Sequence, residues 1–272
     1  MCSTFGHVSS EPHLLVERDG PIVTLTMNRP DSRNALSSEM VARLADAWEM
    51  VNGDEEIRVA ILTGAAGHFS AGADLKSMAG GYGEDEWSKR SRDDPELPWK
   101  ALLRNYRLSK PLVAAVEGYA VAGGTEILQA TDIRVAGESA RFAVAEVTRG
   151  LFPLGGSTVR LRRQIPYTNA MEILLTGEQI SAPEALRIGL IGRVVPDGEA
   201  LAEAAKLAQR VAENAPLSVQ AIKRSVQETE GLPEPEALKV ELEIGLPIFG
   251  TEDAREGAKA FTEKRDPDFK GR

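Results

Sequence analysis

The sequence predicts an α/β fold, in which an α/β body is followed by a helical C-terminal third. Two short apolar runs of β-rich composition open the chain, and the spacing of the apolar residues changes to that of a helix soon after them. Loops of small residues then connect further short apolar runs to helices, and beyond Pro153 helical segments dominate. With 272 residues, the chain is long enough to bury a sizeable core as one large domain.

The amino-acid composition excludes several classes of function. Hydrophobic residues make up 42% of the chain and charged residues 27%, which is typical of a globular protein and not of a disordered or fibrous one. Acidic side chains number 41 against 32 Lys and Arg, so the net charge of −9 leaves no basic excess for binding nucleic acid. The most apolar stretch, residues 111–124, is interrupted by Glu117 and by glycines, so no membrane-spanning helix is expected.

The N-terminus and the scarcity of metal-binding residues narrow the possibilities further. Residues 1–13 contain no basic start followed by an apolar run, so no secretory signal is expected and the cytoplasm is the predicted location. The single cysteine, Cys2, excludes an intrachain disulfide. Because the chain has only three histidines as well, we expect neither a zinc site nor a Cys-His catalytic pair.

Two strands open the predicted body, at residues 14–17 and 22–27. Asp19-Gly20-Pro21 between them is typical of a tight turn, so the two runs predict a hairpin. The polar residues 28–34 then form a loop.

The first helix is predicted to begin at residue 37 or 38. Ser37 or Ser38 can cap its N-terminus, with Glu39 in its first turn. A β-rich run at residues 58–63 follows, which completes a unit of strand, strand, helix and strand. The buried face of the helix is expected to contain Met40, Leu44, Trp48 and Val51, which recur at helical spacing.

A polar segment separates this unit from the next. Residues 78–96 contain several glycines and many charges, which predicts a mobile, loop-like insertion. A strand is expected at residues 112–116, and a helix from Gly123-Gly124 through residue 130. Two more short strands are predicted at residues 133–135 and 141–144.

Helices are expected through most of the C-terminal part. Residues 181–184 fit a capping box with proline near the helix start. Pro216 can begin another helix, and residues 252–264 a further one. We place a boundary near residue 196, with residues 1–196 as the core and 197–272 as a helical C-terminal region. A further apolar helix stripe is predicted from Leu201, Ala204, Ala208 and Val211.

Two loops of small residues can present backbone amides to a ligand. Residues 67–75 follow a strand, and if Asp74 begins a helix, the amides before it point outward as donors. Residues 118–126 repeat this arrangement, so Gly123 or Gly124 offers a second donor. In isolation, either loop is more often a plain connector between a strand and a helix.

Two glutamates lie among apolar residues close to these loops. A glutamate in a first helical turn, such as Glu126, is usually a surface residue that stabilises the helix dipole. Its neighbours are Ala, Val, Gly and Ile, however, where a buried carboxylate without compensation is costly. Glu146 has apolar neighbours on both sides. The alternative interpretation is that it is a solvent-facing glutamate at the end of a strand. Two amide donors and two carboxylates together form a coherent site, because the donors stabilise an oxyanion while the carboxylates move protons.

These segments resemble the signature of the enoyl-CoA hydratase/isomerase family, also called the crotonase family, over residues 14–270. The resemblance is strongest to the bacterial enoyl-CoA hydratases. It implies that the amides of Ala73 and Gly123 bind the thioester oxygen in an oxyanion hole. It also implies that Glu126 is the base and Glu146 the acid, since both family glutamates are present at the spacing of twenty residues seen in the hydratases.

The resemblance extends to the coenzyme A part of the substrate. Residues 28–36 are similar to the family's adenine-side loop, and residues 71–76 to the segment along the bound CoA. Residues 260–265 are similar to a segment that reaches the CoA phosphates of a neighbouring subunit, although Lys264 alone is typical of a solvated helix end. The implied CoA-binding residues are Arg33, Ala35, Ala71, Asp74, Leu75, Lys76, Phe261 and Lys264.

The sequence departs from the family pattern at three positions. Ala122 replaces the first glycine of the usual Gly-Gly-Gly, and Ala143 and Ala145 replace the Gly and Pro that commonly precede the second glutamate. None of these changes removes a proposed donor or carboxylate. They bear on the shape of the acyl pocket rather than on the reaction.

The function implied by the resemblance is hydration of a trans-2-enoyl-CoA to a 3-hydroxyacyl-CoA in fatty-acid or steroid side-chain β-oxidation, with no cofactor beyond the CoA of the substrate. The sequences of residues 125–128 and 133–140 resemble those of bacterial relatives that act on bulky, steroid-type acyl groups, and this favours such a substrate. The implied fold is a crotonase-like spiral of β-β-α units with a helical C-terminal trimerisation region, in a homotrimer or a homohexamer. The alternatives are a Δ3,Δ2-enoyl-CoA isomerase, a thioester hydrolase and a non-catalytic acyl-CoA-binding scaffold.

Overall fold

The larger of two sheets forms the centre of the body. The computed structural model describes residues 11–74 and 83–272. The strand order is β1-β2-β3-β4-β6-β9, with β1 antiparallel to β2 and every later pair parallel. The strands are β1 (Leu14–Asp19), β2 (Ile22–Met27), β3 (Val59–Gly64), β4 (Leu112–Val116), β6 (Ile133–Gly137) and β9 (Arg193–Val195).

A second, smaller sheet lies beside the first and has the order β5-β7-β8. Strand β4 is followed directly by β5, and β6 by β7, so two successive turns of the chain contribute one strand to each sheet. This is the repeating strand-strand-helix arrangement of a spiral, as expected. The strands are β5 (Tyr119–Val121), β7 (Arg141–Ala143) and β8 (Ile180–Ser181).

The predicted hairpin and first helix are confirmed. Leu14 pairs with Met27 and Asp19 with Ile22, and Gly20 adopts a φ of 54° in the turn between them. The helix α1 (Ser38–Gly53) is capped by the Ser37 hydroxyl, which accepts from the Met40 amide. The four apolar residues of the predicted face are completely buried.

The prediction of a loop over residues 78–96 is wrong for its second half. Residues 75–82 lie outside the described residues, but α3 (Glu86–Asp93) and α4 (Leu97–Ala101) follow them. Asp85 caps α3 by accepting from the amides of Trp87 and Ser88. Tertiary contacts with α1 hold the helix, because the Arg43 guanidinium covers the Trp87 ring and Arg90 pairs with Asp46.

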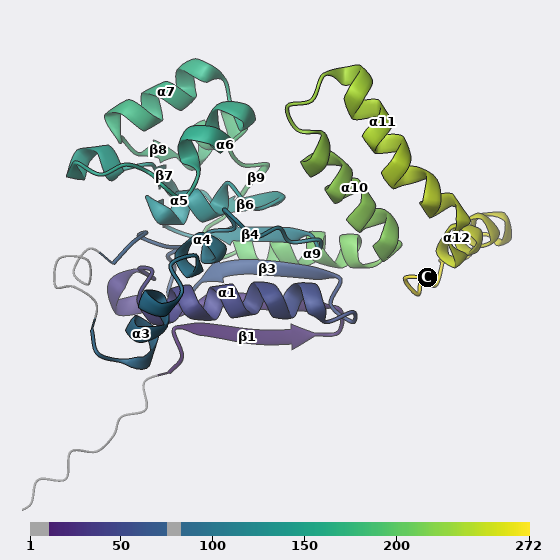
Figure 1. The fold of residues 1–272 in the computed structure, drawn as a ribbon, viewed down its shortest axis with the longest axis horizontal. Coiled ribbons are helices and arrows are strands. Elements are labelled where there is room, and N and C mark those ends of the chain that lie inside the picture. The colour runs from purple at the N-terminus through teal and green to yellow at the C-terminus, as the bar shows by residue number, and fades with distance from the viewer. Residues whose placement is uncertain (1–10, 75–82) are drawn as a thin grey trace, which may run out of the picture.

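The remaining helices of the body cover the two sheets (Figure 1). Ser181 caps α8 by accepting from the Glu184 amide, as its capping box predicts. The predicted stripe on α9 is wrong at Leu201, whose side chain is 41% exposed. The buried stripe consists of Ala200, Ala204, Ala208 and Ala212, whose small side chains let α9 pack closely on the large sheet. These helices are α5 (Gly123–Leu128), α6 (Ser157–Gln164), α7 (Tyr167–Thr176), α8 (Ala182–Arg187) and α9 (Ala200–Ala212).

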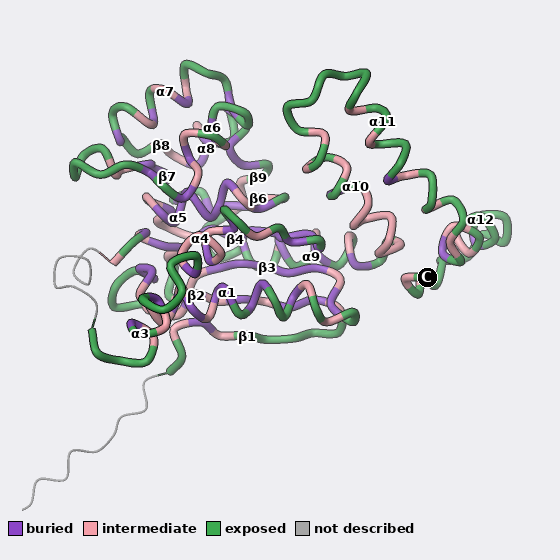
Figure 2. The backbone as a smooth tube through the Cα atoms, in the orientation of Figure 1, coloured by how far each residue is buried: buried purple, intermediate pink, exposed green. Residues whose placement is uncertain are grey.

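The last three helices form an arm that extends away from the body (Figure 1). Proline starts the first of them and residues 252–263 form the last, as expected, but the middle helix was not predicted from the sequence. Most of the arm is exposed or half-buried (Figure 2). Its helices are α10 (Pro216–Thr229), α11 (Glu234–Gly245) and α12 (Glu252–Glu263).

A buried cation helps to attach the arm to the body. Lys223 on α10 pairs with Asp132 at 2.7 Å and donates to the Lys110 carbonyl at 2.8 Å. The same Asp132 carboxylate also accepts from the Leu112 amide. Within residues 11–74 and 83–272, no helix is long and apolar enough to cross a membrane.

Candidate active site

The first carboxylate of the site belongs to Glu126 in the short helix α5, which begins where β5 of the small sheet ends. Only 4% of Glu126 is exposed. Its Oε1 accepts from the Ser157 amide at 3.3 Å, and the nearby Gly155 amide and Ser157 hydroxyl also favour the charged carboxylate. Burial raises the pKa of Glu126, while these hydrogen bonds and the charge of Arg160 act in the opposite direction.

The second carboxylate belongs to Glu146, which opens the 3-10 helix η2 (Glu146–Arg149) after β7. The residue is half-buried, and its Oε2 has no hydrogen-bond partner among the described residues. Burial raises the pKa of Glu146 to about 7, and the negative charge of Glu126 contributes to this rise. A carboxyl with this pKa holds a proton that it can donate near neutral pH.

Two backbone amides with no acceptor lie where the two small-residue loops meet. The loops are paired, because the Ser70 amide donates to Tyr119 at 2.8 Å and Val121 donates back to Ser70 at 2.9 Å. This pairing brings Gly123 close to Ala73, so that a Cβ on Gly123 would lie 3.5 Å from the Ala73 nitrogen. Within the described part of the chain, neither the Ala73 nor the Gly123 amide has a hydrogen-bond acceptor.

The N-cap of α5 is a strained residue. Ala122 has a φ of 51° and a ψ of −124°, a conformation that favours glycine. Its amide donates to the Ala143 carbonyl at 2.8 Å, which holds this conformation against the small sheet. The strain is located directly before the Gly123 amide.

We therefore expect Ala122→Gly to raise the free energy of unfolding by about 1 kcal/mol, because relief of strain exceeds the added entropy of the unfolded chain. Chemical denaturation of both proteins measures this difference. The matched variant Ala120→Gly should instead lower the stability, because it removes a fully buried methyl group from an unstrained strand residue. Equal destabilisation by both substitutions would contradict the presence of strain at Ala122.

The structure gathers four of the predicted CoA-binding residues next to these amides. Arg33 is exposed and its guanidinium covers the Tyr119 ring, with 5.1 Å between its Cζ and the ring centroid. The Ala71 amide donates to the Arg33 carbonyl at 2.9 Å, and Ala35 is buried beside them. Asp74 pairs with Arg29 at 2.9 Å.

The other four predicted CoA-binding residues are not part of this cluster. Leu75 and Lys76 lie outside the described residues. Phe261 and Lys264 lie at the end of α12 in the arm, far from α5 (Figure 1). Phe261 is 84% exposed, so within one chain its ring packs against little else.

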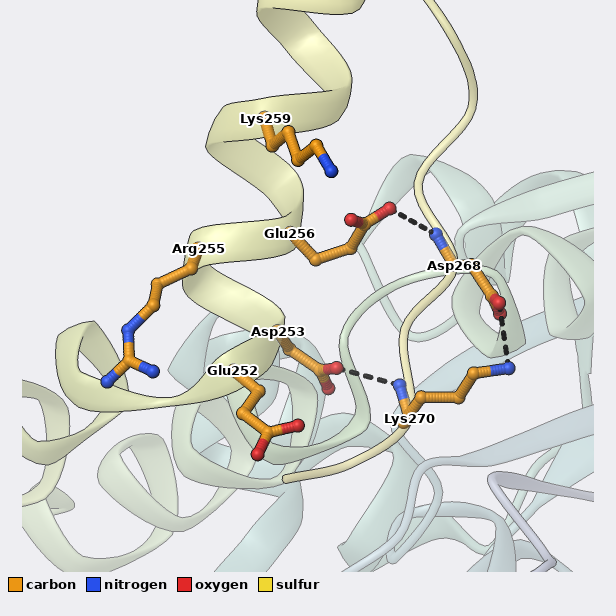
Figure 3. Close-up of a pocket in the computed structure, with 7 residues that line it drawn as sticks. All are labelled: Glu252, Asp253, Arg255, Glu256, Lys259, Asp268 and Lys270. Carbon is orange, nitrogen blue, oxygen red and sulfur yellow. Dashed lines mark hydrogen bonds and ion pairs between the residues drawn. The ribbon is translucent and has the colours of Figure 1, made fainter.

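A cavity lies in the arm, away from the two carboxylates. It has a volume of about 340 Å³ and is located between α12 and the C-terminal tail (Figure 3). The Asp253 oxygens accept from the amides of Lys270 and Gly271, and Glu256 pairs with Arg265. The acidic side chains that line this cavity bind the tail, and these contacts fix the C-terminus on α12. Over residues 11–74 and 83–272, no group of three or more His, Cys, Asp or Glu is placed to hold a metal ion.

Sequence reasoning missed three residues that surround Glu126. Ser157 and Arg160 lie on α6, and Gln129 is the C-cap residue of α5. Gln129 and Ser157 are buried and hydrogen bonded to each other at 2.8 Å. Arg160 donates to the carbonyls of Leu103 and Gly155. The one available signal was the position of Gln129 three residues after Glu126, which places both on one helix face.

The fold is that of a known enzyme family. The family model for enoyl-CoA hydratase/isomerase matches residues 17–272, and the chain belongs to this family. The resemblance to the crotonase family and the predicted crotonase-like fold are thereby confirmed.

Individual relatives are similar to this chain over nearly its full length. The chain is 54% identical to the enoyl-CoA hydratase EchA19 of Mycobacterium tuberculosis over 265 residues, which cover 97% of this chain and 99% of the relative. It is 38% identical to the 2,3-dehydroadipyl-CoA hydratase of Escherichia coli, with coverages of 95% and 99%. Among solved structures, an enoyl-CoA hydratase from M. tuberculosis superimposes with a TM-score of 0.87 at 40% identity, over 96% of this chain and 100% of that one.

Proposed function

We propose that this protein is an enoyl-CoA hydratase, which adds water across the 2,3 double bond of a trans-2-enoyl-CoA in β-oxidation. The observation that carries the proposal is the contrast between two neighbouring carboxyl groups. Glu126 receives several hydrogen-bond donors, whereas the unpaired oxygen of Glu146 belongs to a group whose pKa is raised to about 7. One is thus suited to act as a base and the other as an acid.

The proposed reaction begins with polarisation of the thioester. Water does not add to an isolated alkene at neutral pH, but conjugation with the thioester lets negative charge flow onto the carbonyl oxygen. The free amides of Ala73 and Gly123 stabilise that oxygen as charge develops on it. Their fixed positions require no reorganisation during the reaction.

Proton transfer completes the proposed addition. Glu126 removes a proton from water as the oxygen bonds to C3, and Glu146 gives a proton to the α-carbon. The pair therefore carries the same number of protons before and after the reaction, and its titration belongs to both groups together. No metal or redox group takes part, and coenzyme A is part of the substrate.

The substrate contacts proposed for CoA extend along the first loop. Arg33 and Ala35 belong to the proposed adenine-side loop, and Ala71, Asp74, Leu75 and Lys76 fall along the bound CoA in the proposal. The acyl group is a fatty chain or a bulkier group such as a steroid side chain. The cytoplasmic location of the protein stays a prediction from the sequence.

Absorption of the conjugated enoyl thioester tests the activity directly. Hydration removes the ultraviolet band of the substrate, isomerisation creates it from a 3-enoyl-CoA, and binding alone leaves it unchanged. We expect loss of the band with at least one member of a panel from crotonyl-CoA to long-chain and steroid-tail thioesters. Creation of the band without any loss across the panel would support the isomerase instead.

We further propose that the arm assembles the chain into trimers, or into pairs of trimers. A row of apolar side chains on the arm is exposed, which is unusual for a protein that acts as a monomer. In a trimer, Phe261 and Lys264 would reach the CoA phosphates bound by a neighbouring copy. The exposed side chains are Ile222, Val226, Leu238, Leu242, Leu246 and Phe249.

Light scattering should therefore give three or six times the chain mass of 29.3 kDa. The variant Leu242→Asp places a charge in the apolar row and should shift the mass toward that of the single chain. Glu241→Gln on the same helix serves as the control and should leave the assembly intact. A wild-type mass of 29.3 kDa alone would contradict the trimer and the shared CoA site.

A further inference from the structure

Two polar side chains are buried directly behind Glu126. Gln129 is 2% exposed and Ser157 is completely buried. The Nε2 of Gln129 lies 2.8 Å from the Ser157 Oγ, and the Ser157 amide lies 3.3 Å from Oε1 of Glu126. Gln129, Ser157 and Glu126 therefore form a continuous hydrogen-bonded chain that ends at the proposed base.

The hydrogen bond from Gln129 fixes the direction in which the Ser157 hydroxyl donates. A serine hydroxyl has one hydrogen, and since Gln129 donates to its oxygen, that hydrogen is available for another acceptor. The Ser157 side chain acts to lower the pKa of Glu126, whose carboxylate we therefore take as the acceptor of this hydrogen. If the side-chain amide of Gln129 were rotated by 180°, its oxygen would accept the hydrogen of the Ser157 hydroxyl. The charge-assisted hydrogen bond from Ser157 to the Glu126 carboxylate would then be replaced by a weaker neutral one.

The backbone of Gln129 is held from two other elements. Its carbonyl accepts from Nε2 of Gln164 on α6 at 2.9 Å and from Nη2 of Arg134 on β6 at 3.1 Å. These bonds fix the end of α5 relative to the end of α6 and to β6, and α6 begins at Ser157. The distance between Gln129 and Ser157 is therefore set by the fold, and not by either side chain alone.

We propose that Ser157, oriented by Gln129, is a positioning residue that directs both its amide and its hydroxyl at Glu126 and so holds this base in its charged form. The inference rests on the proposed hydratase function, because it assigns a role through Glu126. Ser157 itself does not touch the reacting atoms. Its effect is on the charge state and the orientation of the carboxylate that does.

The other groups around Glu126 each favour or disfavour its negative charge in a known direction, so the contribution of Ser157 can be separated from theirs. Glu146 on η2 disfavours the charge by repulsion, and Arg160 on α6 favours it. Burial of Glu126 raises its pKa, and the donors at Ser157 oppose that rise. Without the hydroxyl donor, the pKa of Glu126 should increase further.

The test is the pH profile of kcat/KM for hydration, from about pH 5 to about pH 9, because this profile reports the ionisation of the free enzyme. We expect Ser157→Ala to move the lower limb upward by about one pH unit, since a hydrogen bond to a charged group is lost. Ser157→Thr keeps the hydroxyl and should keep the wild-type limb. Gln129→Met should cause a smaller upward shift, because the hydroxyl loses the donor that orients it.

Ser109→Ala is the matched control, since this serine lies on the surface and donates to Asn52. A uniform loss of kcat/KM in Ser157→Ala, with the lower limb unmoved, would show a purely structural role and overturn the inference. An unshifted profile with full activity would overturn it as well. If the wild-type protein hydrates no enoyl-CoA of the panel, the proposed function fails instead.

Discussion

Replacing either Glu126 or Glu146 with glutamine lowers the turnover for hydration by roughly 10²–10⁴-fold, the usual contribution of one acid-base group. Glutamine has nearly the same shape as glutamate, but it can neither accept nor donate the transferred proton. Binding of the thioester should survive in both variants, because the proposed oxyanion amides belong to Ala73 and Gly123. Steady-state kinetics and a binding titration with a substrate analogue measure the two quantities separately.

Loss of folding is not expected to explain this result at Glu146. Its pKa is raised from the ordinary value of 4.5 to about 7, so the charged form is disfavoured in the folded state. Stability is therefore lost as the pH rises through this interval, and Glu146→Gln should be at least as stable as the wild type above pH 7. Glu138→Gln, an exposed glutamate, is the control and should keep full activity. Full hydration activity in either Glu126→Gln or Glu146→Gln would remove that residue from the mechanism.

The substitution Gly72→Ala lowers the hydration rate by about 10²–10³-fold, which is the usual effect of losing one oxyanion donor. Gly72 has a φ of 83°, and a Cβ there would lie 2.7 Å from both the Gly123 nitrogen and the Val121 oxygen. The added methyl group must displace the loop or cover the Gly123 amide. Either change separates the two donors that bind the thioester oxygen.

A matched glycine separates the steric effect from backbone strain. Gly198 has a φ of 86°, but a Cβ there would meet nothing within 4 Å. Gly198→Ala should therefore add backbone strain comparable to that of Gly72→Ala, without its steric clash, and leave kcat close to that of the wild type. Equal kcat values for the two variants would contradict the role assigned to the Gly123 amide.

Local patterns predicted those elements whose stability is decided locally. The period of Met40, Leu44 and Trp48 and the serine cap identified α1, and the turn at Gly20 identified the hairpin. In contrast, α3 is held by the contacts of Trp87 and Arg90 with α1. These distant contacts cannot be predicted from residues 78–96 alone. On α9, the alanines at every fourth position are buried because only small side chains fit between helix and sheet.

The candidate site shows the same division between local and distant information. The small-residue loops and the two glutamates stand out in the sequence because each lies in an unusual local setting. Gln129 and Ser157 do not, since they lie 28 residues apart and meet only through the packing of α5 against α6. Their significance depends on burial and on the direction of one hydroxyl, which are properties of the folded chain.

The incorporation of oxygen from solvent tests the central proposal most directly. The protein is incubated with a trans-2-enoyl-CoA in water enriched in ¹⁸O, and the product is analysed by mass spectrometry. The proposed hydratase places one ¹⁸O atom at C3 of a 3-hydroxyacyl-CoA, and this incorporation falls sharply in Glu126→Gln and Glu146→Gln. A product with a shifted double bond and no ¹⁸O, or unchanged substrate that is merely bound, would contradict it.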